Sequence, residues 1–206
     1  MVRSSESNQV VTMPIFISFY TRDTPYEQEA ERLRTSLNTL NLNYEIRGLK
    51  SLGSWVRNCG QKAKFIQGML EELQQPVVWV DADATVVKRP VLFESFEEEK
   101  IEFAAHRKHM VTGGKELLSG TLYFKPCSKV NLLLEDWVRN CVRFSDLWDQ
   151  RLLDHAIRGL PTQHVPKTQW LPQGYCKIFD RIWREQPKVA YIVHHQASRR
   201  LRRKIR

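Results

Sequence analysis

The hydrophobic positions in the first half of the chain follow two spacings in turn, continuous runs and helical intervals. Residues 14–20 form a run of apolar, β-branched and aromatic side chains, which predicts a buried strand. Four apolar residues then recur at helical intervals: Ala30, Leu33, Leu37 and Leu40. Residues 24–27 have the spacing of a capping box with proline at the first helical position, so we expect a helix to begin there.

The same succession of strand and helix is repeated up to residue 80. Residues 44–47 predict a second strand, and an amphipathic pattern predicts a second helix from about Cys59 until Pro76 stops it. Residues 77–80, with the sequence Val-Val-Trp-Val, are continuously apolar. Such a run is typical of a strand in the middle of a parallel sheet, where both faces are covered.

The second half of the chain is less regular. Three strands are expected, at residues 101–105, 121–124 and 189–193, together with two helices, one from about Ser128 and one from about Asp146 to Gly159. The order βαβαβ followed by mixed elements predicts a single α/β domain, a sandwich with a mixed, mainly parallel central sheet flanked by helices. Residues 1–13 are a polar leader and residues 197–206 a basic tail.

The composition fits a soluble globular protein and excludes several classes. With 42% hydrophobic and 27% charged residues, the chain can bury a real core. It has no apolar run long enough to cross a bilayer, and its N-terminus lacks the apolar segment of a signal peptide, so we expect a cytoplasmic protein. The four cysteines include no Cys-x-x-Cys pair, which argues against a zinc knot or a disulfide scaffold.

The formal net charge of +9 indicates an anionic partner, which could be nucleic acid, a membrane surface or a phosphorylated small molecule. Much of the excess lies in residues 199–206, and this basic tail would suit attraction to an anionic membrane surface. A nucleic-acid-binding or polyanion-binding module is the alternative. It is disfavoured, since the basic residues are concentrated in the tail while the aromatic residues follow core patterns.

Residues that could bind a ligand or take part in catalysis follow three of the predicted strands. In an open α/β sheet, ligands bind outside the carboxyl ends of the strands, so these positions are the candidates for a site. The first strand ends in an aromatic face and a cation that could contact a nucleotide, and acids and histidines follow the two others. These residues are Phe19, Tyr20, Thr21 and Arg22, then Asp81 and Asp83, then His194 and His195.

Asp81 and Asp83 can converge on one cation if the chain leaves strand geometry between them. A hard divalent ion takes carboxylate oxygens, and an imidazole in the shell favours manganese over calcium. Diphosphate oxygens would fill the remaining positions, and the ion would neutralise the charge on a departing nucleoside diphosphate. The alternative is that these acids cap a helix or lie in a solvated loop.

Residues 78–84, Val-Trp-Val-Asp-Ala-Asp-Ala, resemble the DXD signature of the GT-A nucleotide-diphospho-sugar transferases. Further segments resemble the layout of these enzymes in the same order, over roughly residues 14–196: Trp55, Lys62, Phe65-Ile66, Pro90-x-Leu92-Phe93, residues 119–124 and Asp149-Gln150-x-x-Leu153. The resemblance implies a Rossmann-like GT-A sandwich and a metal-dependent glycosyltransferase of class EC 2.4. The donor would be a UDP- or GDP-linked sugar, and the acceptor a hydroxyl of a glycan, a protein or a lipid-linked molecule.

The resemblance also implies a metal shell. In it, Asp83 is the principal ligand of Mn²⁺ or Mg²⁺, and Asp81, joined to it through Ala82, contacts the metal or the ribose. One histidine would complete the shell, and we prefer His195, with His194 as the alternative. Only one of these two neighbours can face the site easily, because side chains alternate along a strand.

The remaining roles are carried over in the same way. Phe19, Tyr20 and Thr21 would cradle the base and ribose, with Arg22 beside them. Lys62 would reach a phosphate or a sugar hydroxyl, unless it is a solvated residue of its helix.

Ser119 and Gly120 begin a strand, and the glycine would let the backbone approach the donor sugar, unless it only marks a bulge. Asp149, followed by Gln150, would accept a proton from the attacking hydroxyl or hold donor hydroxyls, unless it is an ordinary acid of a first helical turn. A nucleotidyltransferase is the rival enzyme, weakened by the lack of a glycine-rich phosphate loop near the N-terminus.

Overall fold

A six-stranded mixed sheet divides the molecule into two layers. The computed structural model describes residues 13–110, 113–179 and 187–201. The strand order is β2-β1-β3-β6-β5-β7, with these bounds: β1 (Ile15–Thr21), β2 (Tyr44–Leu49), β3 (Val77–Val80), β5 (Phe103–His109), β6 (Lys115–Phe124) and β7 (Thr168–Trp170). Pairs β1–β2, β1–β3 and β5–β7 are parallel, whereas β3–β6 and β5–β6 are antiparallel. The mixed, mainly parallel sheet predicted from the sequence is therefore confirmed.

Strand β3 lies between a parallel and an antiparallel neighbour rather than inside an all-parallel stretch. All four of its residues are buried, as the continuous apolar run predicts.

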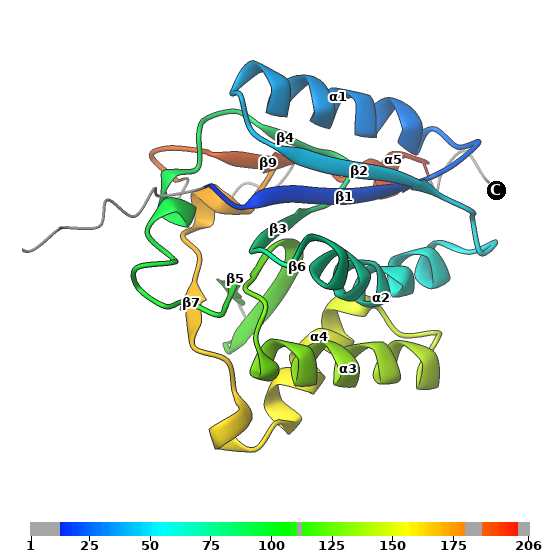
Figure 1. Cartoon of the computed structure of the whole chain (residues 1–206). Coiled ribbons are helices and arrows are strands. Elements are labelled where there is room, and N and C mark those ends of the chain that lie inside the picture. The colour runs from blue at the N-terminus through cyan, green and yellow to red at the C-terminus, as the bar shows by residue number, and fades with distance from the viewer. Residues whose placement is uncertain (1–12, 111–112, 180–186, 202–206) are drawn as a thin grey trace, which may run out of the picture.

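Helices cover one face of the sheet, and a helix with a second, smaller sheet covers the other (Figure 1). Below the sheet lie α2 (Trp55–Leu73), α3 (Ser128–Arg143) and α4 (Asp149–Gly159); above it lies α1 (Tyr26–Thr39). The smaller sheet has the order β4-β9-β8, formed by Ala84–Val86, Ile192–His194 and Lys177–Ile178. The remaining helices are short: the 3-10 turns Val91–Glu94, Thr162–His164 and Gln173–Tyr175, and α5 (Ala197–Leu201).

Each layer has its own hydrophobic core. One core, which includes Trp79 and Trp137, packs the sheet against α2, α3 and α4. The other, which includes Phe16 and Tyr123, fills the space beneath α1 and the smaller sheet. None of the four cysteines is in a disulfide, and no helix among the described residues combines the length and the apolar character needed to span a bilayer.

Several element boundaries differ from those expected. Helix α2 begins at Trp55 rather than near Cys59, because the Ser54 side chain accepts a hydrogen bond from the Arg57 amide and caps it. Helix α4 begins at Asp149 rather than at residue 146, and β6 already begins at Lys115. Helix α1 begins at Tyr26, one residue later than the capping box implies, and Glu27 Oε1 accepts from the Asp23 amide instead of from Thr24.

The smaller sheet has a direct consequence for the site. Strand β4 follows Asp83 and pairs antiparallel with β9, with Ala84 opposite His194. This pairing holds the C-terminal histidine pair beside the end of β3, although more than a hundred residues separate the two segments in the chain.

Candidate functional site

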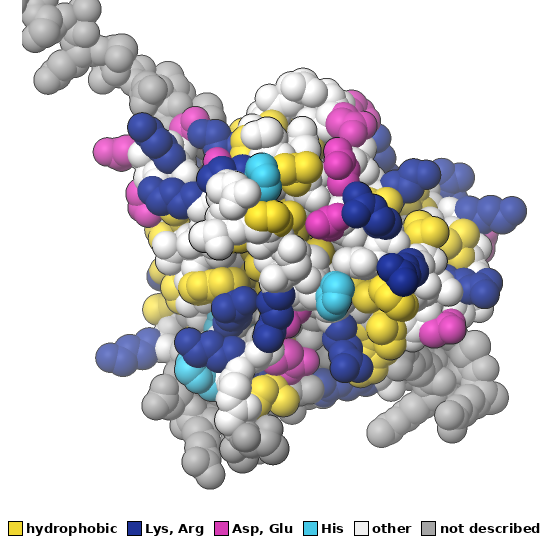
Figure 2. Space-filling model, turned by 90° about the horizontal axis from the view of Figure 1, so that it is seen from below, with side chains coloured by type: hydrophobic (Ala, Val, Ile, Leu, Met, Phe, Trp, Pro, Cys, Tyr) yellow, Lys and Arg dark blue, Asp and Glu magenta, His cyan; other side chains and the backbone are white. Residues whose placement is uncertain are grey.

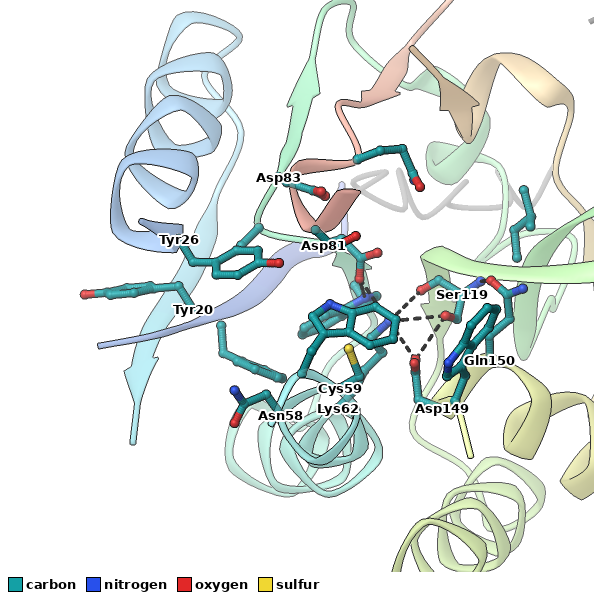
Figure 3. A pocket seen from close by; sticks show the side chains of 18 of the residues that line it. Tyr20, Tyr26, Asn58, Cys59, Lys62, Asp81, Asp83, Ser119, Asp149 and Gln150 are labelled. Atoms are coloured by element: carbon teal, nitrogen blue, oxygen red, sulfur yellow. Dashed lines mark hydrogen bonds and ion pairs between the residues drawn. The ribbon is translucent and has the colours of Figure 1, made fainter. Parts of the chain in front are cut away.

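A cavity of about 340 Å³ opens at the carboxyl ends of β1 and β3. Its walls come from β1, α1, α2, the segment after β3, β6, α4 and the C-terminal helix. Figure 3 shows side chains from these separate elements converging on it. Most of the residues that the sequence singles out line this cavity: Phe19, Tyr20, Thr21, Lys62, Asp81, Ala82, Asp83, Ser119, Asp149 and Gln150.

At the floor of the cavity, a buried lysine bridges two carboxylates. Lys62 Nζ lies 2.8 Å from Asp149 Oδ2 and 2.9 Å from Asp81 Oδ1. It also donates to the Ser119 carbonyl (3.3 Å) and hydroxyl (3.2 Å), and the Ser119 hydroxyl donates to Asp149 Oδ2 at 3.0 Å (Figure 3). Lys62 and Asp149 are 5% and 4% exposed, so water contributes little to their solvation. The cluster therefore links α2, the end of β3, β6 and α4 through charge-assisted hydrogen bonds.

The lysine in this cluster is held in its charged form. Burial alone would lower the pKa of Lys62, but the negative charges of Asp149 and then Asp81 outweigh that effect and raise it. The Asp149 backbone is also fixed, since its carbonyl accepts from the Trp137 indole N–H at 2.9 Å. Asp149 is consequently more than a solvated acid of the first helical turn.

Beside the lysine, Asp81, Asp83 and His194 bring potential ligand atoms within 4.8 Å of one another. Asp81 Oδ1 is occupied by Lys62 and by the Trp79 indole N–H at 3.0 Å, and Asp83 Oδ2 accepts from the Ala197 amide at 2.7 Å. Each carboxylate is thus oriented by contacts to one of its oxygens. Outer contacts of this type commonly orient metal ligands.

The protonation of Asp83 and His194 fits a cation. Burial, followed by the nearby charge of Asp81, raises the pKa of Asp83 to about 6, so a positive charge placed between the two carboxylates would be favourable. Burial lowers the pKa of His194 to about 4, so its imidazole is neutral at pH 7 and able to act as a ligand. Thr121 Oγ1 lies 2.9 Å from His194 Nε2 and fixes the ring. Two carboxylates and one imidazole are a donor set that could hold a divalent cation.

The structure brings His194, and not the preferred His195, into this cluster. The side chain of His195 lies on the other side of β9, with Nε2 2.9 Å from Thr85 Oγ1 and its ring 5.5 Å from that of Phe179. The reason is the register of β9, which places His194 opposite Ala84 and directs the next residue away.

Gly120 has a different neighbour from the one expected. A Cβ atom there would lie 2.8 Å from Cε1 of His194, so the group that approaches this backbone is the imidazole. Gly120 does not line the cavity, whereas Ser119 does. The Ser119 amide donates to Gln150 Oε1 at 3.2 Å.

The residues after β1 fall into two groups. Phe19 packs its ring against those of Phe65 and Trp79, so only part of its surface reaches the cavity, while Tyr20 and Thr21 line the cavity beside it. Arg22 does not line the cavity, because its Nε donates to the Gly48 carbonyl at 2.8 Å on the neighbouring strand β2.

Sequence reasoning missed several lining residues. They are mainly aromatic or polar: Tyr26, Asn58, Cys59, Glu116, Trp148, Gln196, Ser198 and Arg199. Tyr26 and Trp148 lie at helix N-termini. Because helices in an α/β fold begin near the carboxyl ends of the strands, where ligands bind, the rule used for the strand ends could also have identified these two residues. No local signal marks Glu116 or Arg199.

Residues 53–206 match the sequence profile of a family described as nucleotide-diphospho-sugar transferase. No sequence among the curated proteins matches the chain.

Solved glycosyltransferase structures share the fold at low sequence identity. One enzyme, involved in the glycosylation of the major capsid of PBCV-1, is 14% identical with a TM-score of 0.66 over 94% of this chain and 100% of its own. Mouse xyloside xylosyltransferase 1 is 11% identical with a TM-score of 0.59 over 90% of this chain and 98% of its own. GlyE of Streptococcus pneumoniae TIGR4 is 13% identical with a TM-score of 0.57; the match covers 89% of this chain and 55% of GlyE.

Proposed function

Because the chain belongs to the family of nucleotide-diphospho-sugar transferases, we propose that it transfers a sugar from a UDP- or GDP-linked donor to a hydroxyl acceptor, with Mn²⁺ or Mg²⁺ held by Asp81, Asp83 and His194. The observation that carries this proposal is that Asp81 and Asp83, whose oxygens lie within 4.8 Å of the buried His194 imidazole, line one cavity together with the Lys62–Asp149 pair. A candidate cation site thus lies next to a buried, charged ion pair at the floor of the cavity.

The positions of the lining residues suggest where the base, the diphosphate and the sugar of the donor would lie in the cavity. Tyr20 and Tyr26 lie on one side of Asp81 and Asp83, and Asp149 lies on the other (Figure 3). An aromatic face suits a base and its ribose, and a cation between the carboxylates suits the diphosphate. The sugar then comes to lie over Lys62, Ser119 and Asp149.

The cation, when bound, would offset the charge that develops on the departing nucleoside diphosphate. Side chains of the protein would position the substrates and accept the proton. Lys62 holds Asp81 and Asp149 in place, because its buried ammonium pairs with both carboxylates. The contacts of Asp149 involve Oδ2, so Oδ1 is the oxygen that would accept a hydrogen bond from a donor hydroxyl or a proton from the attacking hydroxyl.

The acceptor hydroxyl would belong to a glycan, a protein or a lipid-linked molecule. The predicted attraction of the basic tail to an anionic membrane remains a prediction, because residues 202–206 lie outside the described residues. The alternative of a polyanion-binding module has less support. On the face shown in Figure 2, Lys and Arg side chains are interspersed with acidic and hydrophobic ones rather than gathered in one continuous surface.

A thermal-shift screen of nucleoside diphosphates and nucleotide sugars, with Mn²⁺, with Mg²⁺ or with a chelator, tests the proposal. A ligand that binds only the native state raises the unfolding temperature. At a free ligand concentration of 100 times Kd, the free energy of unfolding increases by about 2.7 kcal/mol. We expect a UDP- or GDP-compound to stabilise the protein with Mn²⁺. On incubation, the matching nucleotide sugar should release its nucleoside diphosphate as its sugar passes to an added hydroxyl acceptor or, more slowly, to water. If no nucleotide raises the unfolding temperature with either Mn²⁺ or Mg²⁺, the proposed function is wrong.

A further inference from the structure

Two tryptophans stand where the cavity meets solvent. Trp55 is the first residue of α2 and Trp148 immediately precedes α4, and both line the cavity. Their ring centroids are 6.1 Å apart with planes at 88°, an edge-to-face pair. Trp148 is 49% exposed, although an indole gains more than most side chains from burial. A large exposed aromatic surface at the rim of a site commonly marks a ligand-binding surface.

The position of Trp148 is rigidly tied to Asp149. The Trp148 carbonyl accepts from the amides of Arg151 (3.0 Å) and Leu152 (3.2 Å), which fixes the residue at the start of α4. The next carbonyl, that of Asp149, accepts from the buried Trp137 indole. These bonds fix the backbone of both residues, and the edge-to-face contact with Trp55 restricts the Trp148 indole, so a ring stacked on it would be held at the start of α4.

Two polar side chains of the same cavity are held by hydrogen bonds. Gln150, the second residue of α4, donates through Nε2 to Glu116 Oε1 at 2.9 Å, and its Oε1 accepts from the Ser119 amide. Both side chains line the cavity. Because Gln150 orients Glu116 through one oxygen, the second carboxylate oxygen is available to accept from a hydroxyl group.

These residues lie on the acceptor side of the proposed donor. In the proposed function the nucleotide lies on the far side of Asp81 and Asp83, where Figure 3 shows Tyr26 and Tyr20. An aromatic surface next to Asp149 lies beyond the sugar, where the second substrate must enter for its hydroxyl to reach the anomeric carbon.

We infer that Trp148, supported by Trp55, forms the acceptor subsite, and that it takes the ring of a neutral sugar. The C–H face of a pyranose would stack on the Trp148 indole while a hydroxyl donates to Glu116. The carboxylate of Glu116 opposes a negatively charged group at this position, so uronic acids are disfavoured. This inference rests on the proposed function and specifies its acceptor.

Kinetics on Trp148 variants test the subsite, with methyl glycosides of neutral hexoses and pentoses as acceptor probes and the donor at saturation. We expect Trp148→Ala to raise the KM for the best glycoside by roughly 10-fold or more, with a smaller effect on kcat. Trp148→Phe should restore most of the lost affinity, because a flat aromatic face remains. Trp170→Ala is the matched control, since Trp170 is 37% exposed but does not line the cavity.

A second variant and a binding measurement separate the outcomes. Glu116→Gln should also raise the acceptor KM, and it should lessen the preference for methyl glucoside over methyl glucuronide. The affinity of Trp148→Ala for UDP or GDP with Mn²⁺ should match that of the wild type, which shows that the donor side is intact. An acceptor KM within twofold of the wild type in Trp148→Ala would overturn the inference, as would a wild type that cleaves its donor yet uses no glycoside. A wild type that neither binds nor cleaves any nucleotide sugar would instead refute the proposed function.

Discussion

The imidazole of His194 lies directly against the backbone of Gly120, so closely that a Cβ atom at position 120 would come within 2.8 Å of Cε1. Replacement of Gly120 by alanine should displace this ring. We expect Gly120→Ala to reduce stability by about 1–3 kcal/mol, as overpacking does, and to weaken Mn²⁺ binding. Denaturant unfolding and a metal titration measure the two effects. Gly68→Ala is the control: nothing lies within 4 Å of a Cβ there, and alanine in a helix should be neutral or stabilising.

The two neighbouring histidines should behave differently. His194→Ala removes a side chain of the Asp81–Asp83 cluster and should abolish the increase in nucleotide affinity that Mn²⁺ provides. His195→Ala removes a hydrogen bond to Thr85, costs about 1 kcal/mol and should leave that increase in place. Isothermal titration of both variants with UDP and GDP distinguishes them. The reverse pattern would restore His195 as the ligand.

Lys62 and Lys64 form a matched pair on α2, one buried and one exposed. Lys62→Met leaves the buried Asp149 and the partly exposed Asp81 without their cation, so we expect a loss of about 3–5 kcal/mol in the free energy of unfolding, mainly from Asp149. Lys64→Met should change that free energy by less than about 0.5 kcal/mol. Urea unfolding followed by fluorescence gives both values. Equal losses of unfolding free energy in the two variants would show that the buried ion pair does not stabilise the fold more than an exposed lysine does.

The charge of Asp149 can be removed with little change in shape. Asp149→Asn should lower kcat by roughly 10²-fold or more, the scale of losing a general base, with little change in donor affinity. Asp154→Asn on the same helix alters a carboxylate that pairs with Arg158 outside the cavity, and should leave kcat unchanged. Steady-state kinetics with a donor titration decide the matter. Normal turnover in Asp149→Asn would assign Asp149 to structure alone.

The sequence predicts the fold well where one local pattern decides it. The continuous apolar run of β3 and the helical spacing of Leu33 and Leu37 belong to single elements, and both elements form as expected. Strands β4 and β8 have three and two residues, and they exist because of pairing with β9 rather than through local preference. No local pattern announces such strands.

The site shows the same division. The rule that ligands bind at the carboxyl ends of strands locates Asp81 and Asp83 in the cavity from the sequence alone. Strand alternation indicates that only one of His194 and His195 faces these acids, but which one depends on the register between β4 and β9. Likewise, Arg22 turns to Gly48 because β2 runs alongside β1, and that contact is a tertiary one.

The central claim is that a cation joins the carboxylates of Asp81 and Asp83 to the diphosphate of the donor. Isothermal titration of the wild type with UDP and with GDP, in Mn²⁺ and then in excess chelator, measures this most directly. We predict that one of the two binds at least roughly 10-fold more tightly with Mn²⁺, since two carboxylates would otherwise face the diphosphate. The Asp83→Ala variant should fold normally and lose this difference. Equal affinity of the wild type in Mn²⁺ and in chelator would contradict the metal-bridged donor site.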